Sequence, residues 1–266
     1  MQSFLSKNDI KLSQEFEKKG YLIRNISNKK ALKKIKNLFI KFIKKELKIS
    51  KKIKSHYLLN NIHKFLTTRN LNSFRIKLIN HINNTEEFKK LYYLLSKNYL
   101  EVLVGNELVM QKRINLSIQI PNDNSSLLPV HSDVWSGDSP FEIVVWLPLV
   151  NCYRTKAMYI LPPSKYENMK KIFLDKKSTS SEKIYKKIKK DLQWIKIKYG
   201  QVLLFNQCLP HGNIVNKESE TRWSLNCRFK GIFSPYKDKK LGEFFEPVTL
   251  RTISKLAIKY NLPKIK

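Results

Sequence analysis

Residues 113–120 read Arg-Ile-Asn-Leu-Ser-Ile-Gln-Ile, with apolar and polar side chains in strict alternation. Successive side chains of a β-strand point to opposite faces, so this stretch predicts a strand with one apolar face and one polar face. The apolar face holds Ile114, Leu116, Ile118 and Ile120. The polar face holds Asn115, Ser117 and Gln119. Such a polar face belongs either to a solvent-facing strand edge or to the wall of a polar pocket.

Further strand patterns follow this one in the second half of the chain. They lie at 143–149, 158–161, 193–199, 202–205 and 222–230. The segment 143–149 is apolar on both faces, as in a strand that is covered on both sides. Gly200 and Gln201 turn the chain into 202–205. The pattern predicts a mainly β domain with flanking helices.

The first hundred residues have a different pattern. Residues 29–54 contain twelve lysines and one acid, Glu46, with apolar residues at helical spacing. The apolar stripe is Leu32, Ile35, Phe39, Phe42, Ile43 and Leu47. This predicts an amphipathic helix whose stripe packs on the domain, or less commonly lies on a membrane. We expect more helix at 57–67 and 86–104.

The expected organisation has two parts within one structural domain. Residues 1–105 form a mostly helical region that packs on the core. Residues 106–266 form the β core, with a basic helical insertion at about 165–191 and a final helix near 250–260.

The net charge of +31 invites a nucleic-acid interpretation. However, 44 of the 52 basic residues are lysine and only 8 are arginine, whereas phosphate and base recognition rely on the guanidinium fork. We therefore interpret most lysines as exposed residues and do not expect a nucleic-acid partner. Attraction to anionic substrates, membranes or nucleic acid stays open as the alternative.

Several protein classes are excluded by counting. The seven glycines are too widely spaced for a dinucleotide or P-loop phosphate motif, and the three cysteines have no CxxC spacing. No stretch approaches the length of a membrane span, since the uncharged, mostly apolar run 143–153 has only eleven residues. The N-terminal residues lack the pattern of a secretory signal. We expect a cytoplasmic protein with no membrane span and with reduced cysteines.

Two histidines have a context that favours metal chemistry. His131 and Asp133 stand two positions apart after the 113–120 strand, so in extended backbone both side chains point the same way. A glycine turn, an apolar strand and a short loop then lead to His211. Two neutral imidazoles and one carboxylate form the facial triad of non-haem Fe(II) oxygenases. Each residue could singly be an ordinary loop or turn residue.

An arginine follows the second histidine at a short distance. Arg222 comes eleven positions after His211 and shares a strand face with Ser224, Asn226 and Arg228. A guanidinium fork beside a hydroxyl group suits a dicarboxylate ligand. An ordinary strand-surface arginine is the alternative interpretation.

These elements, in this order, resemble the motif of the Fe(II)/2-oxoglutarate-dependent oxygenases over about residues 113–230. The segments 146–150 and 161–164 are similar to the phytanoyl-CoA-hydroxylase-like branch. More narrowly, residues 131–142, 146–149, 211–213 and 222–226 look like the oxygenases of sporadically distributed bacterial carbohydrate-biosynthesis clusters.

The resemblance implies a site and a reaction. His131, Asp133 and His211 would bind Fe(II), and Arg222 with Ser224 would hold the distal carboxylate of the cosubstrate 2-oxoglutarate. The implied fold is a double-stranded β-helix, a jelly-roll or cupin-like core, with a helical N-terminal region. The implied enzyme is a dioxygenase that uses O2 to hydroxylate or otherwise oxidise a small, sugar-containing intermediate of carbohydrate or surface polysaccharide biosynthesis.

The substrate residues and two alternative functions complete the expectations. Trp135, Asn115 and Gln119 are candidates for the substrate pocket. The spacing of Arg222 and Arg228 also resembles nucleic-acid-repair dioxygenases, so an oxygenase that acts on nucleic acid is one alternative. A non-enzymatic basic β-barrel binding module is the other.

Overall fold

The computed structural model describes residues 4–166 and 180–260, and its strands form two antiparallel sheets. The larger sheet has the order β1-β7-β4-β9-β2-β10, with β3 also paired to β9, and the smaller sheet has the order β6-β5-β8. The strands are β1 (Tyr21–Asn25), β2 (Leu108–Gln111), β3 (Asn115–Gln119), β4 (Glu142–Pro148), β5 (Tyr159–Ile160), β6 (Gln193–Trp194), β7 (Gln201–Asn206), β8 (His211–Gly212), β9 (Arg222–Gly231) and β10 (Phe245–Thr249). The predicted mainly β architecture with flanking helices is confirmed.

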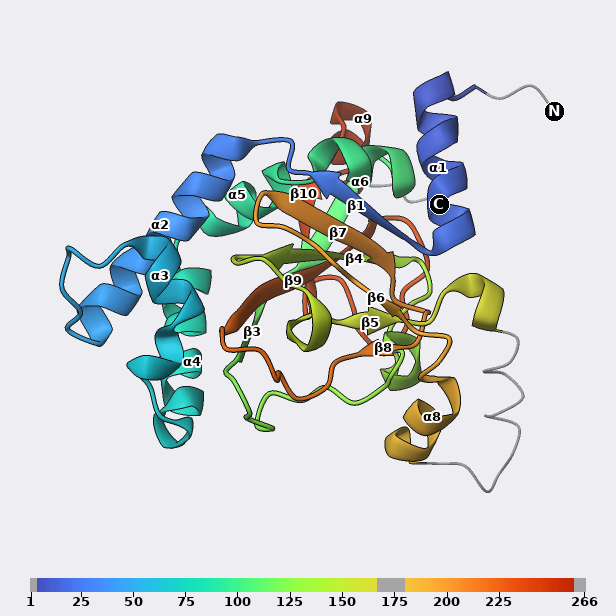
Figure 1. Cartoon of the computed structure of the whole chain (residues 1–266). Helices are drawn as coiled ribbons and strands as arrows, with labels where there is room; N and C mark the ends of the chain where they lie inside the picture. Colours follow the sequence, from blue (N-terminus) through green and yellow to red (C-terminus); the bar gives the residue numbers. More distant parts are fainter. Residues whose placement is uncertain (1–3, 167–179, 261–266) are drawn as a thin grey trace, which may run out of the picture.

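Helices cover the sheets from several sides (Figure 1). They are α1 (Lys7–Lys19), α2 (Lys29–Glu46), α3 (Ser55–Asn60), α4 (Thr68–Asn83), α5 (Phe88–Leu94), α6 (Lys97–Leu103), α8 (Ser181–Ile188) and α9 (Thr252–Ile258), with short 3-10 helices at Ile62–Lys64, Asp133–Ser136 and Arg154–Lys156. Figure 1 shows α2, α3 and α4 along one side of the molecule and α8 on the opposite side, next to the smaller sheet. The site residues expected from the sequence lie on β3, β8, β9 and the 3-10 helix Asp133–Ser136, with His131 in an isolated β-bridge just before that helix.

The lysine-rich helix α2 packs its apolar stripe on the domain, as the sequence predicts. Leu32, Ile35 and Phe39 are buried in the main core, and the Phe39 ring is nearly perpendicular to that of Trp223 on β9, with 6.4 Å between the centroids. The stripe is therefore buried and does not present an apolar face to a membrane. The helix ends at Glu46, and Lys48 has a positive φ of 52°.

Some expected elements differ from the structure. The pattern at 193–199 gives only the short strand β6, followed by an isolated bridge between Ile197 and Cys152. The basic insertion at about 165–191 contains α8, but residues 167–179 of that prediction lie outside the described residues. The expected helix at 57–67 is broken into α3 and the 3-10 helix Ile62–Lys64, because the chain turns at Asn61.

Several elements were not individually expected from the sequence, namely α1, α4, β1, β2, β8 and β10. Helix α4 buries Leu71, Phe74 and Leu78, and the helical spacing of these apolar residues could have predicted this helix. Strands β1 and β10, with the sequences Tyr-Leu-Ile-Arg-Asn and Phe-Glu-Pro-Val-Thr, show no strict alternation of apolar and polar side chains. Because β1 pairs with β7 in full antiparallel register, the helical N-terminal region also contributes a strand to the larger sheet. The division of the chain at residue 105 remains a prediction.

Across the described ranges 4–166 and 180–260, no helix combines the length and the apolar character needed to cross a membrane.

Candidate active site

The two histidines that the sequence singles out lie side by side in the fold. His131 and His211 form an isolated antiparallel β-bridge, in which each backbone N–H donates to the carbonyl oxygen of the other, at 3.0 and 2.8 Å. Their imidazole rings lie 4.3 Å apart between centroids. Backbone pairing therefore brings together two side chains that are far apart in the chain.

A close backbone approach holds the segment of His211 in place. A Cβ atom on Gly212 would lie only 2.6 Å from the Tyr159 hydroxyl group and 2.7 Å from the carbonyl oxygen of Leu128. The neighbouring Asn213 donates its backbone N–H to that Leu128 carbonyl oxygen at 2.9 Å. Only glycine fits between these groups, so residue 212 helps to fix the position of the adjacent imidazole.

The three predicted metal ligands converge. Asp133 Oδ1 lies 3.6 Å from His131 Nε2 and 3.9 Å from His211 Nε2, and one ligand atom from each residue lies within 4.8 Å of the others. Asp133 and His211 are buried, whereas the side chain of His131 is 33% exposed. This arrangement has the donor set of a 2-His-1-carboxylate site, with the ligand atoms close enough to share one ion, which suits Fe(II).

Hydrogen bonds leave the Nε2 atoms of both histidines available for a metal. His131 Nδ1 lies 2.8 Å from the carbonyl oxygen of Pro129, and His211 Nδ1 lies 2.9 Å from that of Leu209. A carbonyl oxygen only accepts, so each Nδ1 carries the proton and each Nε2 carries the lone pair. Burial, reinforced by the neighbouring His131, lowers the pKa of His211 to about 4. The His211 imidazole is therefore neutral at physiological pH, as metal binding requires.

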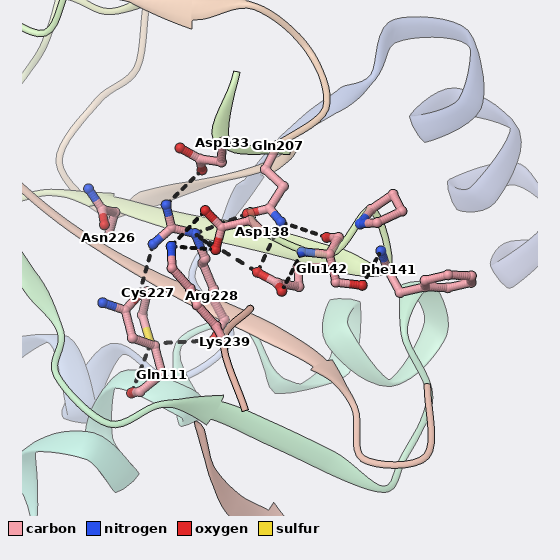
Figure 2. A network of polar contacts seen from close by, with 12 residues as sticks. Gln111, Asp133, Asp138, Phe141, Glu142, Gln207, Asn226, Cys227, Arg228 and Lys239 are labelled. Atoms are coloured by element: carbon pink, nitrogen blue, oxygen red, sulfur yellow. Dashed lines mark hydrogen bonds and ion pairs between the residues drawn. The ribbon is translucent and has the colours of Figure 1, made fainter. Parts of the chain in front are cut away.

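The second carboxylate oxygen of Asp133 is bound by an arginine. Arg228 Nη2 lies 3.0 Å from Asp133 Oδ2, so Oδ1 is the oxygen that faces the two imidazoles. Figure 2 shows Arg228 at the centre of a polar network. Its Nε donates to Gln207 Oε1 at 3.0 Å and lies 3.6 Å from Asp138 Oδ1, and Lys239 Nζ in turn contacts Asp138. Arg228 thus holds Asp133 as a ligand through one oxygen.

Replacing Arg228 by methionine should weaken metal binding without removing a ligand. The freed Asp133 carboxylate can rotate, so we expect the affinity for Fe(II) to fall by about 10- to 100-fold, the usual effect of losing a residue that orients a ligand. Arg228→Lys should recover part of the loss, because it restores one charge-assisted contact. Anaerobic metal titration measures the change. An unaltered Fe(II) affinity in Arg228→Met would show that Arg228 does not orient Asp133.

Arg222 lies in the same strand face of β9 and is almost completely buried. It is 2% exposed, and its Nη2 donates to Ser117 Oγ at 3.0 Å. Its Nε and Nη1 atoms are buried and have no hydrogen-bond partner within residues 4–166 and 180–260. Burial lowers the pKa of the Arg222 guanidinium to about 10. A buried cation with two unsatisfied donors is the arrangement that a bound carboxylate would complete.

One cavity of about 210 Å³ joins the two halves of the site. Its wall includes the three convergent side chains and the pair predicted to hold the cosubstrate: His131, Asp133, His211, Arg222 and Ser224. The alternation predicted for 222–230 is confirmed, since Arg222, Ser224, Asn226 and Arg228 line this cavity. The intervening Trp223, Leu225 and Cys227 are buried in the main core.

The three predicted substrate residues have different positions. Asn115 lies on the cavity wall and donates from Nδ2 to Asn226 Oδ1 at 3.0 Å. Gln119 is buried outside the cavity lining and donates to the carbonyl oxygen of Ile214. Trp135 lies in the 3-10 helix after Asp133, is 42% exposed and is also outside the lining. Trp146 and Phe205 also line the cavity, but their position could not be predicted because their pattern is that of any buried strand.

The sequence matches no family model, and no curated protein is significantly similar to it. Solved structures are similar in fold. ThoJ, a non-heme monooxygenase in a nickel complex, is 13% identical with a TM-score of 0.56, over 91% of this chain and 85% of ThoJ. SnoK, a non-heme alpha ketoglutarate dependent carbocyclase from nogalamycin biosynthesis, is 12% identical with a TM-score of 0.54, over 92% of this chain and 97% of SnoK. EctD from S. alaskensis, solved with 2-oxoglutarate and 5-hydroxyectoine, is 13% identical with a TM-score of 0.54, over 87% of this chain and 79% of EctD.

The chain has the double-stranded β-helix fold of the non-haem oxygenases. At this level of identity the similarity concerns the fold, and it confirms the predicted fold class. In this double-stranded β-helix, the triad lies where the segment after β3 meets β8, and Arg222 lies at the start of β9.

Proposed function

We propose that this protein is an Fe(II)- and 2-oxoglutarate-dependent dioxygenase that oxidises a small metabolite. One observation carries the proposal: a single cavity contains a 2-His-1-carboxylate cluster and a buried guanidinium with two unsatisfied N–H donors. Metal-binding clusters and buried arginines each have other uses in proteins. Their combination in one cavity fits a metal ion and a dicarboxylate that bind side by side.

Each group has a defined task in this proposal. His131, Asp133 and His211 hold Fe(II), and Arg222 with Ser224 holds the distal carboxylate of 2-oxoglutarate. Bound Fe(II) supplies the chemistry by which O2 converts 2-oxoglutarate to succinate and CO2 while a substrate C–H bond is oxidised. Apolar side chains on the wall exclude water from the cavity. They include Val144, Trp146, Met158 and Phe205.

We further propose a sugar-containing substrate and a cytoplasmic location. The support for the sugar is the resemblance of residues 131–142 and 211–213 to oxygenases of carbohydrate-biosynthesis clusters. The paired amides of Asn115 and Asn226 on the cavity wall suit hydroxyl groups, because an amide both donates and accepts. Gln119 and Trp135 stay predicted substrate residues whose contribution, given their positions, would be indirect.

The two alternative functions have less support. In the nucleic-acid alternative, Arg228 would be the second recognition arginine, but its guanidinium is engaged with Asp133, Gln207 and Gln111. In the binding-module alternative, the lysine-rich helix would anchor the protein, but its apolar stripe is buried in the core.

The decisive experiment is anaerobic loading with Fe(II) and 2-oxoglutarate, followed by O2. Succinate would be scored across a panel of sugars, nucleotide sugars and nucleic acids. We expect succinate formation that depends on both Fe(II) and 2-oxoglutarate and that is stimulated by one sugar class. Failure of the protein to bind Fe(II) and 2-oxoglutarate together would refute the proposal.

The exposed lysines of α2, and Lys48 just after it, should not matter for a small substrate. Lys33, Lys41, Lys45 and Lys48 are exposed, so the variant with glutamine at all four positions should keep turnover within a few-fold. The reason is that screening over about 8 Å at physiological salt isolates exposed charges from a distant site. Turnover at increasing salt checks the expectation. A steep salt dependence and a selective loss on a polyanionic substrate would instead indicate a docking surface.

A further inference from the structure

A second cavity adjoins the candidate active site and shares part of its wall. It measures about 420 Å³ and lies between helix α4 and strand β3. Asn115, Ser117, Leu128 and Asn226 line both this outer cavity and the inner cavity of the triad. The two cavities are therefore neighbours on either side of these four residues.

Two arginines line the outer cavity. Arg75 comes from α4, and Arg113 comes from the residues that lead into β3. Only 8 of the 52 basic residues are arginine, and four of these eight line the two adjoining cavities, the inner pair being Arg222 and Arg228. Lysine supplies the general positive charge of this protein. Arginine, with its planar fork of donors, is concentrated where a ligand would lie.

The side chains that hold the outer arginines are neutral. Arg75 donates from Nη2 to Asn72 Oδ1 at 2.6 Å and from Nη1 to Ser126 Oγ at 3.3 Å. Arg113 donates from Nη2 to Asn80 Oδ1 at 2.8 Å. Neither arginine forms an ion pair with an acid within the described parts of the chain, whereas Arg228 pairs with Asp133. These contacts orient both guanidinium groups, but their neutral acceptors do not offset either positive charge.

The two segments that carry the arginines, α4 and the residues leading into β3, are hydrogen-bonded to each other. Asn83 on α4 donates from Nδ2 to the carbonyl oxygen of Ile114 at 3.0 Å, and the Ile114 N–H donates back to Asn83 Oδ1 at 2.9 Å. This reciprocal pair joins α4 to the start of β3, next to Arg113. The arginines are therefore presented on an ordered surface, which lowers the entropic cost of binding a ligand.

We propose that the outer cavity is an anion subsite, in which Arg75 and Arg113 bind a phosphate or carboxylate group of the substrate. The inference rests on the proposed oxygenase function, and it names the substrate class as an elongated anionic metabolite. Arg113 comes four positions before Ser117, the residue that contacts Arg222, which is a span of up to about 13 Å at about 3.3 Å per residue. The anionic group therefore lies well away from the carbon that is oxidised next to the triad.

Calorimetric titration with glucose 1-phosphate, glucuronate and glucose tests the subsite at physiological salt. The variant Arg75→Gln/Arg113→Gln removes both forks. The variant Lys33→Gln/Arg69→Gln removes the same charge from exposed positions of α2 and α4 and serves as the control. We expect the wild type and the control to bind an anionic sugar more tightly than glucose, and the Arg75/Arg113 variant to bind it at least about 10-fold more weakly. Preference for glucose 1-phosphate assigns a phosphate group, and preference for glucuronate assigns a carboxylate.

Three outcomes would overturn the subsite. In the first, both double variants lose the same affinity for the anionic sugar. In the second, the Arg75/Arg113 variant keeps the affinity of the wild type. In the third, the wild type shows no saturable binding of either anionic sugar at millimolar concentration. Unchanged melting temperatures would show that the variants fold. Binding of 2-oxoglutarate, measured separately, should be unchanged in both, since neither outer arginine lines the inner cavity. If the wild type does not bind 2-oxoglutarate, this result would count against the oxygenase function and not against the subsite.

Discussion

Replacing Asp133 by alanine is expected to abolish Fe(II) binding and succinate formation. Asp133 Oδ1 is the atom that faces both imidazole Nε2 atoms, so its loss leaves two neutral nitrogen ligands and no anionic ligand. His131→Ala and His211→Ala should have the same effect. We expect each variant to lose at least about 100-fold in metal affinity, more than the loss of a residue that only orients a ligand. Anaerobic metal titration and a succinate assay measure the two quantities.

Two controls separate metal binding from folding. His56→Ala removes an exposed imidazole that does not line the cavity, and it should leave Fe(II) affinity unchanged. Asp133→Ala also removes the closest of the carboxylates that pair with Arg228, so Asp133→Asn, which preserves the shape, should melt closer to the wild type. Wild-type Fe(II) affinity in any two of the three ligand variants would rule out the triad.

Replacing Arg222 by methionine should remove 2-oxoglutarate binding while leaving the ligand-free fold as stable as before, or more stable. Two unsatisfied buried N–H donors cost roughly 1–3 kcal/mol each, and methionine removes that cost while keeping an apolar stem of similar length. The same two donors would bind the distal carboxylate of 2-oxoglutarate. Losing them should weaken 2-oxoglutarate binding by at least about 100-fold. Calorimetric titration and thermal melts with and without 2-oxoglutarate measure both effects.

A purely structural role for Arg222 makes the opposite prediction. In that case Arg222→Met would lower the melting temperature, and 2-oxoglutarate would bind and stabilise it as it does the wild type. Arg222→Lys should lie between the wild type and Arg222→Met in 2-oxoglutarate affinity and keep nearly normal Fe(II) affinity, because a point ammonium cannot form two parallel hydrogen bonds. The exposed Arg69→Met is a control for general loss of charge. If 2-oxoglutarate affinity does not change, Arg228 becomes the next candidate.

Local periodicity explains which parts of the fold could be predicted. The alternation in 222–230 places Arg222 and Ser224 on the cavity face, because a strand has the same two-residue period wherever it lies. The apolar stripe of α2 could be predicted in the same way, from the helical spacing of its apolar residues. Two-residue elements such as β8 show no period, so their pairing could not be read from the sequence. Gln119 and Trp135 lie outside the cavity lining. Their positions depend on packing against other segments, which the periodicity of the sequence does not predict.

By itself, the sequence determined the strand and helix patterns, the order of His131, Asp133, His211 and Arg222, and the chemistry that these residue types could perform. Only the tertiary structure decided that the two histidines share a β-bridge, that Arg228 binds one oxygen of Asp133, and that Arg222 keeps two unsatisfied donors. It also created the outer cavity, by packing α4 against β3. The physical reason is that periodicity follows from local backbone geometry, whereas these contacts arise when strands and helices far apart in the chain pair and pack.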